Sequence, residues 1–485
     1  MNARTSLSAC LALLLTACAA VGPDYHLPEQ AKINAPGAQQ PFQEAGLKAV
    51  ANAEGPSDWW RLYDEPQLNG LIKEALAANT SLRVAAANLA RSEAVAMEAD
   101  GAREVKAGAS LALERAQVSG ESFLLEHKVP VFNLGNAGVR VGYQVDLAGG
   151  LQRAIEAADA DVEASRAALD LARISIVADT ALAYMEACAA GHELEVAEHN
   201  LALQEQQHQA VARLIAGGRA MAVDLPRAKH QVEQLRATLP AYTARRRVAL
   251  YKLAVLTGHP PGEYPRPLET CKQLPELKQP IPVGDGAALL RRRPDVRQAE
   301  RTLAGATARI GVATAALYPS IALGFSAGLT GIMEHMGQAP TRRWSLGPLI
   351  SWTLPGDEEK ARVRQADANA AGALAKFDTV VLNALHEVES ALANLARDLD
   401  RDAALRQARN EAAKARRQIQ ALYRAGRLAY LDDLDAQRSL AAADTALAAS
   451  SAQLATDQIK LFLALGGGWQ SAAQAEAHSA EKPSH

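Results

Sequence analysis

The chain has 485 residues and a formal net charge of −3, so it lacks the basic excess of a nucleic-acid-binding protein. Hydrophobic residues make up 49% of it, but aromatic residues only 4%, and alanine is abundant throughout. This composition argues against a compact aromatic core and favours long helices packed closely side by side.

The N-terminus has the pattern of a bacterial export signal. An apolar run over residues 11–15 follows a single arginine and leads into Leu15-Thr16-Ala17-Cys18. The run predicts a signal peptide over residues 1–17. The tetrad matches a lipobox, in which the cysteine is acylated and becomes the mature N-terminus; an ordinary signal peptide cut nearby is the alternative. Ala19, where an aspartate would retain a lipoprotein in the inner membrane, favours the outer membrane. We expect residues 18–60 to form an extended, lipid-anchored segment, with the lipid on Cys18 as the only added group.

Strands are the predicted membrane-crossing elements, because no stretch after the signal approaches the roughly 18 apolar residues that a spanning helix needs. Three segments alternate apolar residues with small or polar ones: 139–146, 320–329 and 344–354. A fourth strand, over 106–116, alternates poorly. Strands of about ten residues with one apolar face are typical of transmembrane barrels. Four strands cannot close a barrel, so we expect several chains to share one; a small soluble sandwich is the alternative.

Two very long helices are predicted. Residues 358–423 contain no proline and a single glycine, Gly372. Their apolar residues step by three and four positions, which is a coiled-coil seam: Val381, Leu385, Val388, Leu392, Leu395 and Leu399. At about 1.5 Å per residue this helix would be roughly 100 Å long. Residues 151–214 are its counterpart, and the flanking alanines favour packing on two sides, as in a cylinder.

The chain is an internal duplication. At an offset of 208 residues, "LIAGGRAMAVDLPRAKHQ" matches "LYRAGRLAYLDDLDAQRS", and "LAVLTG" matches "LFLALG". We expect a first repeat over residues 61–262, a proline-rich linker over 263–283, a second repeat over 284–469 and a disordered tail over 470–485. Each repeat has the order helix, strand, strand, very long helix, tight turn, helix.

Four segments carry a resemblance to a known family. They are "ACAAVGPDYHLPE", "RRRPDVRQAERTLAGATARIGVATAALYPSIAL", "LYRAGRLAYLDDLDAQRSL" and "ALGGGW". Together they resemble the TolC-like outer membrane efflux lipoproteins, of the NodT-like subfamily, over the mature chain from Cys18 to about Trp469. The resemblance implies a mostly α-helical homotrimer with a twelve-stranded β-barrel in the outer membrane and a coiled-coil helical barrel in the periplasm. It also implies a periplasmic adaptor protein and an inner-membrane transporter, of the resistance-nodulation-division type, as partners. Two departures place the barrel-to-helix junction in question: the acidic "LPGDEEKAR" of residues 354–362, and Val105 where the second repeat has Pro319.

The two duplicated turns are, by this resemblance, the periplasmic tips. Gly218 and Gly426 are predicted to supply the helix-ending backbone. With Arg219 they form the predicted adaptor-docking tips. Pro226 is tolerated in a first helical turn.

The second tip carries the predicted gate. In the family the second-half hairpin closes the tunnel, and the matching positions are Tyr423, Arg424, Arg427, Asp432 and Asp435. An N-cap role would explain Asp432 without a gate, because its first-half equivalent is Asp224. Asp435 has no such equivalent, since Arg227 stands there. Whether Arg424 and Arg427 pair with these acids or are solvated stays open.

Other motifs predict little chemistry. Cys188 lies in a helix and Cys271 in the linker, and sequence alone cannot pair them, so we expect two structural cysteines without a bridge. "HELEVAEH" lacks the second histidine of a zinc-protease helix, and Met333, His335 and Met336 fit a surface loop better than a soft-metal site. "RRRPD" is predicted to begin a helix. We expect no enzyme, metal or nucleic acid. The function predicted is a passive exit duct of a tripartite efflux system. The alternatives are a lipid-anchored coiled-coil tether without a pore, or the duct of a metal-efflux or type I secretion system.

Overall fold

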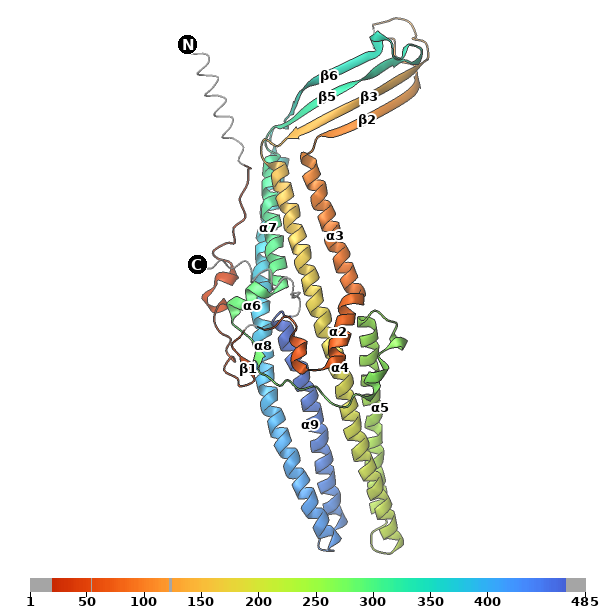
Figure 1. Ribbon diagram of the computed structural model, residues 1–485, viewed down its shortest axis with the longest axis vertical. Coiled ribbons are helices and arrows are strands. Elements are labelled where there is room, and N and C mark those ends of the chain that lie inside the picture. Colours follow the sequence, from red (N-terminus) through yellow and green to blue (C-terminus); the bar gives the residue numbers. More distant parts are fainter. Residues whose placement is uncertain (1–19, 54, 122–123, 468–485) are drawn as a thin grey trace. The chain divides into compact units, whose positions relative to one another are not determined.

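The computed structural model describes residues 20–53, 55–121 and 124–467. They form two compact units, each made of three separate stretches of the chain, which Figure 1 colours by residue number. The first comprises Met1–Pro28, Asn88–Arg166 and Gln298–Phe377, and the second comprises Glu29–Ala87, Ala167–Arg297 and Asp378–His485. Each unit therefore combines segments from both halves of the duplication. Cys18, Trp469 and the predicted tail lie outside the described residues.

The element order follows the duplication. The helices are α2 (Pro66–Ala78), α3 (Thr80–Asp100), α4 (Gly150–Ala216), α5 (Asp224–Leu256), α6 (Gly286–Arg292), α7 (Pro294–Ala315), α8 (Asp357–Arg424) and α9 (Tyr430–Ala464). The strands are β1 (Val50–Ala51), β2 (Lys106–Ala116), β3 (Phe132–Val145), β4 (Ile281–Pro282), β5 (Ser320–Ile332) and β6 (Arg342–Ser351). Short 3₁₀ helices are η1 (Lys32–Asn34), η2 (Pro36–Ala38), η3 (Trp59–Tyr63), η4 (Gly101–Arg103), η6 (Pro261–Glu263), η7 (Arg266–Thr270), η8 (Met333–His335) and η9 (Ala339–Thr341). The four predicted strands and both very long helices are confirmed.

The first unit contains an antiparallel sheet with the strand order β2-β3-β5-β6. Its register aligns the apolar positions of neighbouring strands, for example Val141 with Phe325, and Phe325 with Leu346. Since side chains alternate between the two faces of a strand, this register gathers the apolar residues on one face. Several predicted bounds were wrong. β3 begins at Phe132 and β5 ends at Ile332, both beyond the alternating stretches. β6 ends at Ser351, and Trp352 turns away to donate a hydrogen bond to the Leu317 carbonyl at 3.0 Å.

The first unit also holds the beginning of the N-terminal segment, up to Pro28, whereas the rest of that segment belongs to the second unit. Arg153 on α4 is buried and binds this segment through three groups: the Val21 carbonyl (3.1 Å), the Gly22 carbonyl (3.3 Å) and the Asp24 carboxylate (2.7 Å). Glu156 pairs with the same guanidinium at 2.8 Å. Residues 21–24 are thereby fixed to the start of α4.

The junction to α8 is ordered by the acidic residues that distinguish it. Asp357, Glu358 and Glu359 occupy the first turn of α8, where the helix dipole favours negative charge. The Glu359 carboxylate accepts a hydrogen bond from the Gly356 amide at 3.0 Å. These backbone hydrogen bonds hold the pKa of Glu359 below its usual range. The acidic residues by which this junction departs from the family pattern therefore cap the start of α8.

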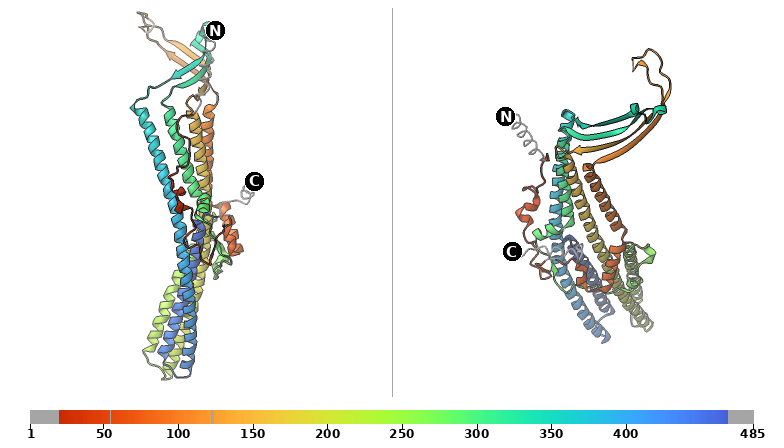
Figure 2. Two further views of the ribbon diagram at one scale, coloured as in Figure 1. Left: turned by 90° about the vertical axis from the view of Figure 1, so that its left-hand side faces the viewer. Right: turned by 45° about the horizontal axis from the view of Figure 1, so that its top comes forward.

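The second unit packs two helical hairpins, α4–α5 and α8–α9, which Figure 2 shows side by side down to their turns. Most of the predicted seam on α8 is buried: Val381, Val388 and Leu392 have no exposed surface. In the same core, Trp59 stacks on Phe462 with ring centroids 4.6 Å apart. Pro294 is the first residue of α7, so "RRRPD" leads into a helix as predicted. The buried Arg293 that precedes it pairs with Asp295 and Glu387, each at 2.7 Å.

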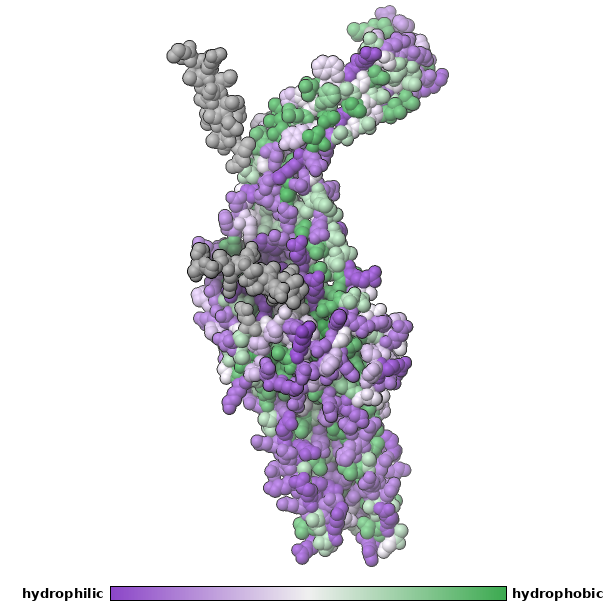
Figure 3. All heavy atoms as spheres, viewed as in Figure 1, coloured by the Kyte–Doolittle hydropathy of each residue, from purple (hydrophilic) through white to green (hydrophobic). Residues whose placement is uncertain are grey.

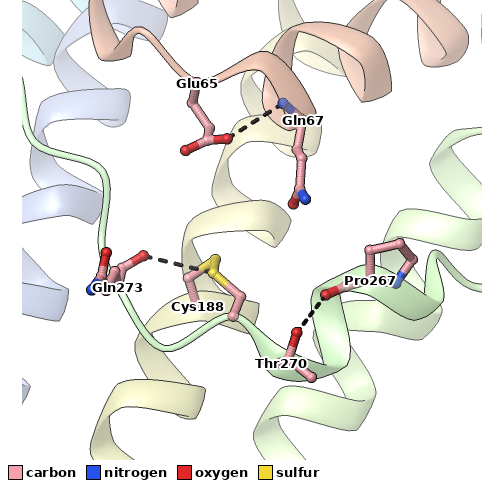
Figure 4. The surroundings of a disulfide bond; sticks show 7 residues. Glu65, Gln67, Cys188, Pro267, Thr270 and Gln273 are labelled. Carbon is pink, nitrogen blue, oxygen red and sulfur yellow. Dashed lines mark hydrogen bonds between the residues drawn. A yellow bond between two sulfur atoms is a disulfide. The ribbon is translucent and has the colours of Figure 1, made fainter.

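The expectation of two unbridged cysteines was wrong. Cys188 on α4 and Cys271 form a disulfide bond across 83 residues of sequence. Figure 4 shows Cys188 facing the linker segment that carries Thr270 and Gln273. Gly191 allows the approach, since a Cβ there would lie 2.0 Å from the Cys271 carbonyl oxygen. The linker is therefore attached to α4 rather than free, which spacing along the sequence cannot reveal.

One 18-residue stretch of helix α4 has the length and composition of a membrane-spanning helix, contrary to the prediction that no such stretch follows the signal. That stretch is 78% buried by other parts of the protein, as in the core helix of a soluble domain.

Candidate functional site

The two duplicated turns have the same backbone design. Two residues after the end of α4 and of α8 stands a glycine with positive φ, +69° at Gly218 and +72° at Gly426. In each turn the next residue's amide bonds back five residues: Arg219 to the Leu214 carbonyl (2.8 Å) and Arg427 to the Leu422 carbonyl (2.9 Å). This is the Schellman motif, which satisfies the last carbonyls of a helix. The tips are therefore defined turns rather than loose loops.

Asp432 has a capping role that the duplication shares, but it is not the N-cap residue. Its carboxylate accepts a hydrogen bond from the Ala429 amide at 3.0 Å, and Asp224 accepts one from the Met221 amide at 3.3 Å. Each acid thus binds the amide three residues before it, as the acidic partner of a capping box does. The predicted N-cap position was wrong, while a structural role for this pair is supported.

The other predicted gate residues are distributed over the surface of the second tip. Asp435 is exposed and lies 3.7 Å from Arg438, a contact of little energetic weight. Arg424 and Arg427 are exposed, and in the described part of the single chain neither is within ion-pair distance of a carboxylate. Tyr423 is near Tyr430, with ring centroids 6.4 Å apart, and burial raises the pKa of both phenols.

Sequence reasoning missed the residue that joins the two hairpins at this end. Asp433 is almost fully buried, with 2% of its surface exposed. It pairs with Arg416 of α8 at 2.9 Å and accepts a hydrogen bond from Gln207 of α4 at 3.2 Å. The first repeat has Leu225 at the equivalent position, so an acid replacing an apolar residue was the available signal. Asp433 links α4, α8 and α9.

A cleft of about 680 Å³ lies between the four helices of the hairpins. Its lining includes three buried amides that have an atom without a hydrogen-bond partner in the protein: Asn200, Gln204 and Gln437. Because unpaired buried polar groups are costly, water is the expected occupant of these sites. The hairpins are therefore packed less densely here than along the apolar seam.

The sheet of the first unit is the second candidate surface. Large apolar side chains remain exposed on one face, among them Trp344 (76% exposed), Leu346 (74%) and Leu111 (71%). Figure 3 shows hydrophobic residues gathered over the sheet and mostly hydrophilic ones towards the hairpin turns. Soluble monomers rarely expose a continuous apolar surface of this extent. The face is suited to contact with lipid.

The described residues hold no group of three or more histidine, cysteine or acidic side chains that would bind a metal. "HELEVAEH" instead contributes a structural ion pair, because the buried Glu193 lies 2.5 Å from Arg245 on α5. Burial raises the pKa of this glutamate. Met333 and His335 belong to η8, in the connection between β5 and β6.

The sheet of the first unit has a large exposed apolar face, and the second unit consists of two long helical hairpins; together they define a membrane-associated class of protein. The chain belongs to the outer membrane efflux protein family, whose model matches residues 71–259 and 287–467. It is therefore an outer membrane protein, and the family is one of efflux proteins rather than enzymes.

Relatives match along nearly the whole chain. Nodulation protein T of Rhizobium leguminosarum bv. trifolii is 28% identical over 96% of this chain and 97% of its own length. The toluene efflux pump outer membrane protein TtgC of Pseudomonas putida is 31% identical over 94% of each. The solved structure of the outer-membrane channel OprN superposes with a TM-score of 0.86 at 31% identity, over 93% of this chain and all of that one.

Proposed function

We propose that three copies of the chain form the exit duct of a tripartite efflux system, through which small toxic compounds leave passively. One observation carries the proposal: the sheet has an exposed apolar face and two unpaired edges, β2 and β6. In a bilayer every backbone group must be paired, so an open sheet cannot remain single. An even number of antiparallel strands per copy lets β6 of one chain pair antiparallel with β2 of the next. Three sheets of four strands would close at twelve, a size within the known range of such barrels.

Two adjacent residues on β6 test the barrel. Leu346 is on the apolar face and Ser345 on the opposite one. We expect Leu346→Arg to cost about 2–4 kcal/mol if it faces the bilayer midplane, whereas Ser345→Arg is tolerated. The readout is the amount of heat-modifiable trimer in the outer membrane fraction. Equal effects of the two substitutions, or a monomer in detergent, would refute the closed barrel.

The hairpin tips are the proposed meeting point with a periplasmic adaptor, which would connect the duct to an inner-membrane transporter. Gly218, Arg219 and Gly426 are exposed, and so are the neighbouring apolar side chains Met221 and Leu422. Exposed apolar side chains beside a glycine backbone favour docking of a partner helix or turn. Acylation of Cys18 would add a lipid anchor next to the segment that Arg153 holds. Because the family is one of efflux proteins, we infer a duct and not an enzyme.

The second tip is the proposed gate, with Asp435 as its determinant. Threefold symmetry would bring three copies of Asp435 and of the capping Asp432 towards one axis, together with Tyr423, Arg424 and Arg427. A ring of exposed carboxylates favours cations. We expect Asp435→Ala to change single-channel conductance and to weaken block by multivalent cations in planar bilayers. An Asp435→Ala channel with unchanged conductance and cation block would show that this residue is not part of the gate.

A further inference from the structure

The polar face of the sheet carries an unbalanced positive charge. The four strands contain five basic residues, Lys106, Arg115, Arg140, Arg342 and Arg343, and one acidic residue, Glu114. The register assigns Lys106, Arg140, Arg343 and Glu114 to the face opposite the apolar one. That face therefore has an excess of two positive charges per chain.

Arg343 is held across this face by neutral acceptors. Its guanidinium donates to Thr330 Oγ1 on β5 at 2.8 Å and to Asn136 Oδ1 on β3 at 3.0 Å. Within the described residues no carboxylate pairs with it. Gly138 lies beneath it, since a Cβ there would meet Arg343 Nη2 at 3.5 Å. The charge is thus oriented along the sheet surface and is not neutralised.

Arg140 is equally uncompensated. Its cross-strand neighbours on the same face are Gly108 on β2 and Ser326 on β5, and Ser326 bonds to Ser345 at 2.8 Å. The next row along the sheet contains Lys106, Gly142, Gly324 and Gly347, so its one large side chain is another basic residue. Other carboxylates near the sheet, such as Glu121 and Glu334, belong to the connections between strands. The residues around both arginines are small or uncharged: glycine, serine, Thr330 and Asn136.

We propose that this face lines the barrel lumen as an anion-attracting wall, with Arg343 and Arg140 as the residues that set charge preference. The inference rests on the proposed trimer, in which the excess of two charges per chain becomes six. Rings of arginine or lysine are the usual basis of anion preference in pores. The permeants favoured are therefore small organic and inorganic anions, bearing carboxylate, phosphate or sulfonate groups. The barrel lumen would thus carry a net positive charge, whereas the second hairpin tip carries exposed carboxylates.

Adjacent arginines on β6 provide a matched test. Arg343 is on the polar face, while Arg342 is on the apolar face, so Arg343→Gln and Arg342→Gln remove the same charge from opposite sides. Reversal potentials are measured in planar bilayers across a KCl gradient. We expect Arg343→Gln to lower the chloride-to-potassium permeability ratio by about twofold and Arg342→Gln to leave it unchanged. Arg140→Gln should act like Arg343→Gln and replaces it if that variant fails to form trimers.

Salt dependence separates wall charge from a change in pore shape. The Debye length is about 30 Å at 0.01 M and about 3 Å at 1 M, so the difference between wild type and Arg343→Gln should grow at low salt and vanish at high salt. A conducting channel whose permeability ratio is unchanged in Arg343→Gln and Arg140→Gln would overturn this inference alone. A wild-type trimer without any conductance would overturn the proposed duct and this inference with it.

Discussion

Reduction of the Cys188–Cys271 disulfide should measurably destabilise the helical part of the protein. The bridge closes a loop over a sequence separation of 83 residues. In the chain-entropy model a loop of this length stabilises the folded state by about 4.5 kcal/mol, because it restricts the unfolded chain. For 485 residues the entropy of unfolding is roughly 1 kcal/mol per kelvin, so the loss corresponds to a midpoint about 4–5 °C lower.

The assay is thermal unfolding of the detergent-solubilised protein, followed by far-ultraviolet circular dichroism with and without dithiothreitol. The double variant Cys188→Ala/Cys271→Ala is the matched control, because it has no bridge to reduce and should not respond to the reagent. Each single alanine variant should behave like the double one. A wild-type midpoint that dithiothreitol leaves unchanged, with two titratable thiols before reduction, would refute the bridge.

Two further predictions concern buried acids. Asp433→Ala leaves the largely buried Arg416 without its partner and should cost about 3–5 kcal/mol, seen as faster hydrogen exchange in the first turns of α9. Asp435→Ala, two residues away and exposed, should cost no more than about 1 kcal/mol. Equal rates of hydrogen exchange in the two variants would show that Asp433 does not join the hairpins. Burial of Asp457, and after it a hydrogen bond to Asp398, raises the pKa of the Asp457 carboxyl. The contribution of this carboxyl to stability is therefore present at low pH and is lost as the pH rises through its pKa in the folded state. Asp457→Asn should therefore raise the unfolding midpoint at pH 7 and have no such effect below about pH 3.8. An equal rise of the unfolding midpoint at pH 7 and below about pH 3.8 would exclude titration of Asp457 as the cause.

Periodicity predicted the long elements because it reports which faces are buried. The seam from Val381 to Leu399 identified α8, and the alternation over 320–329 identified β5, since each pattern extends over many residues. The end of β6 was misplaced by the same reasoning. Trp352 continues the alternation but leaves the strand to bond with Leu317, and a pattern of hydrophobicity does not record that hydrogen bond.

Contacts between distant segments were beyond sequence reasoning. Nothing in the spacing of Cys188 and Cys271 shows that the linker returns to α4 at Gly191, so the disulfide could not be inferred. Asp433 was missed for a related reason. Its neighbour Asp432 had an obvious local role at a helix start, whereas the partners of Asp433, Arg416 and Gln207, are contributed by two other helices. Burial of a charge is a tertiary property.

The duplication acts as an internal control that separates capping from gating. Both tips need a glycine to end one helix and an acid to begin the next, and both have them: Gly218 with Asp224, and Gly426 with Asp432. What the second tip adds is Asp433, which fixes its position against α4 and α8, and Asp435, which stays exposed where the first tip has Arg227. Since the shared features suffice to fold a turn, the two added acids require another explanation. In the proposed gate, the buried Asp433 would hold the tip at one position while the exposed Asp435 faces the permeant.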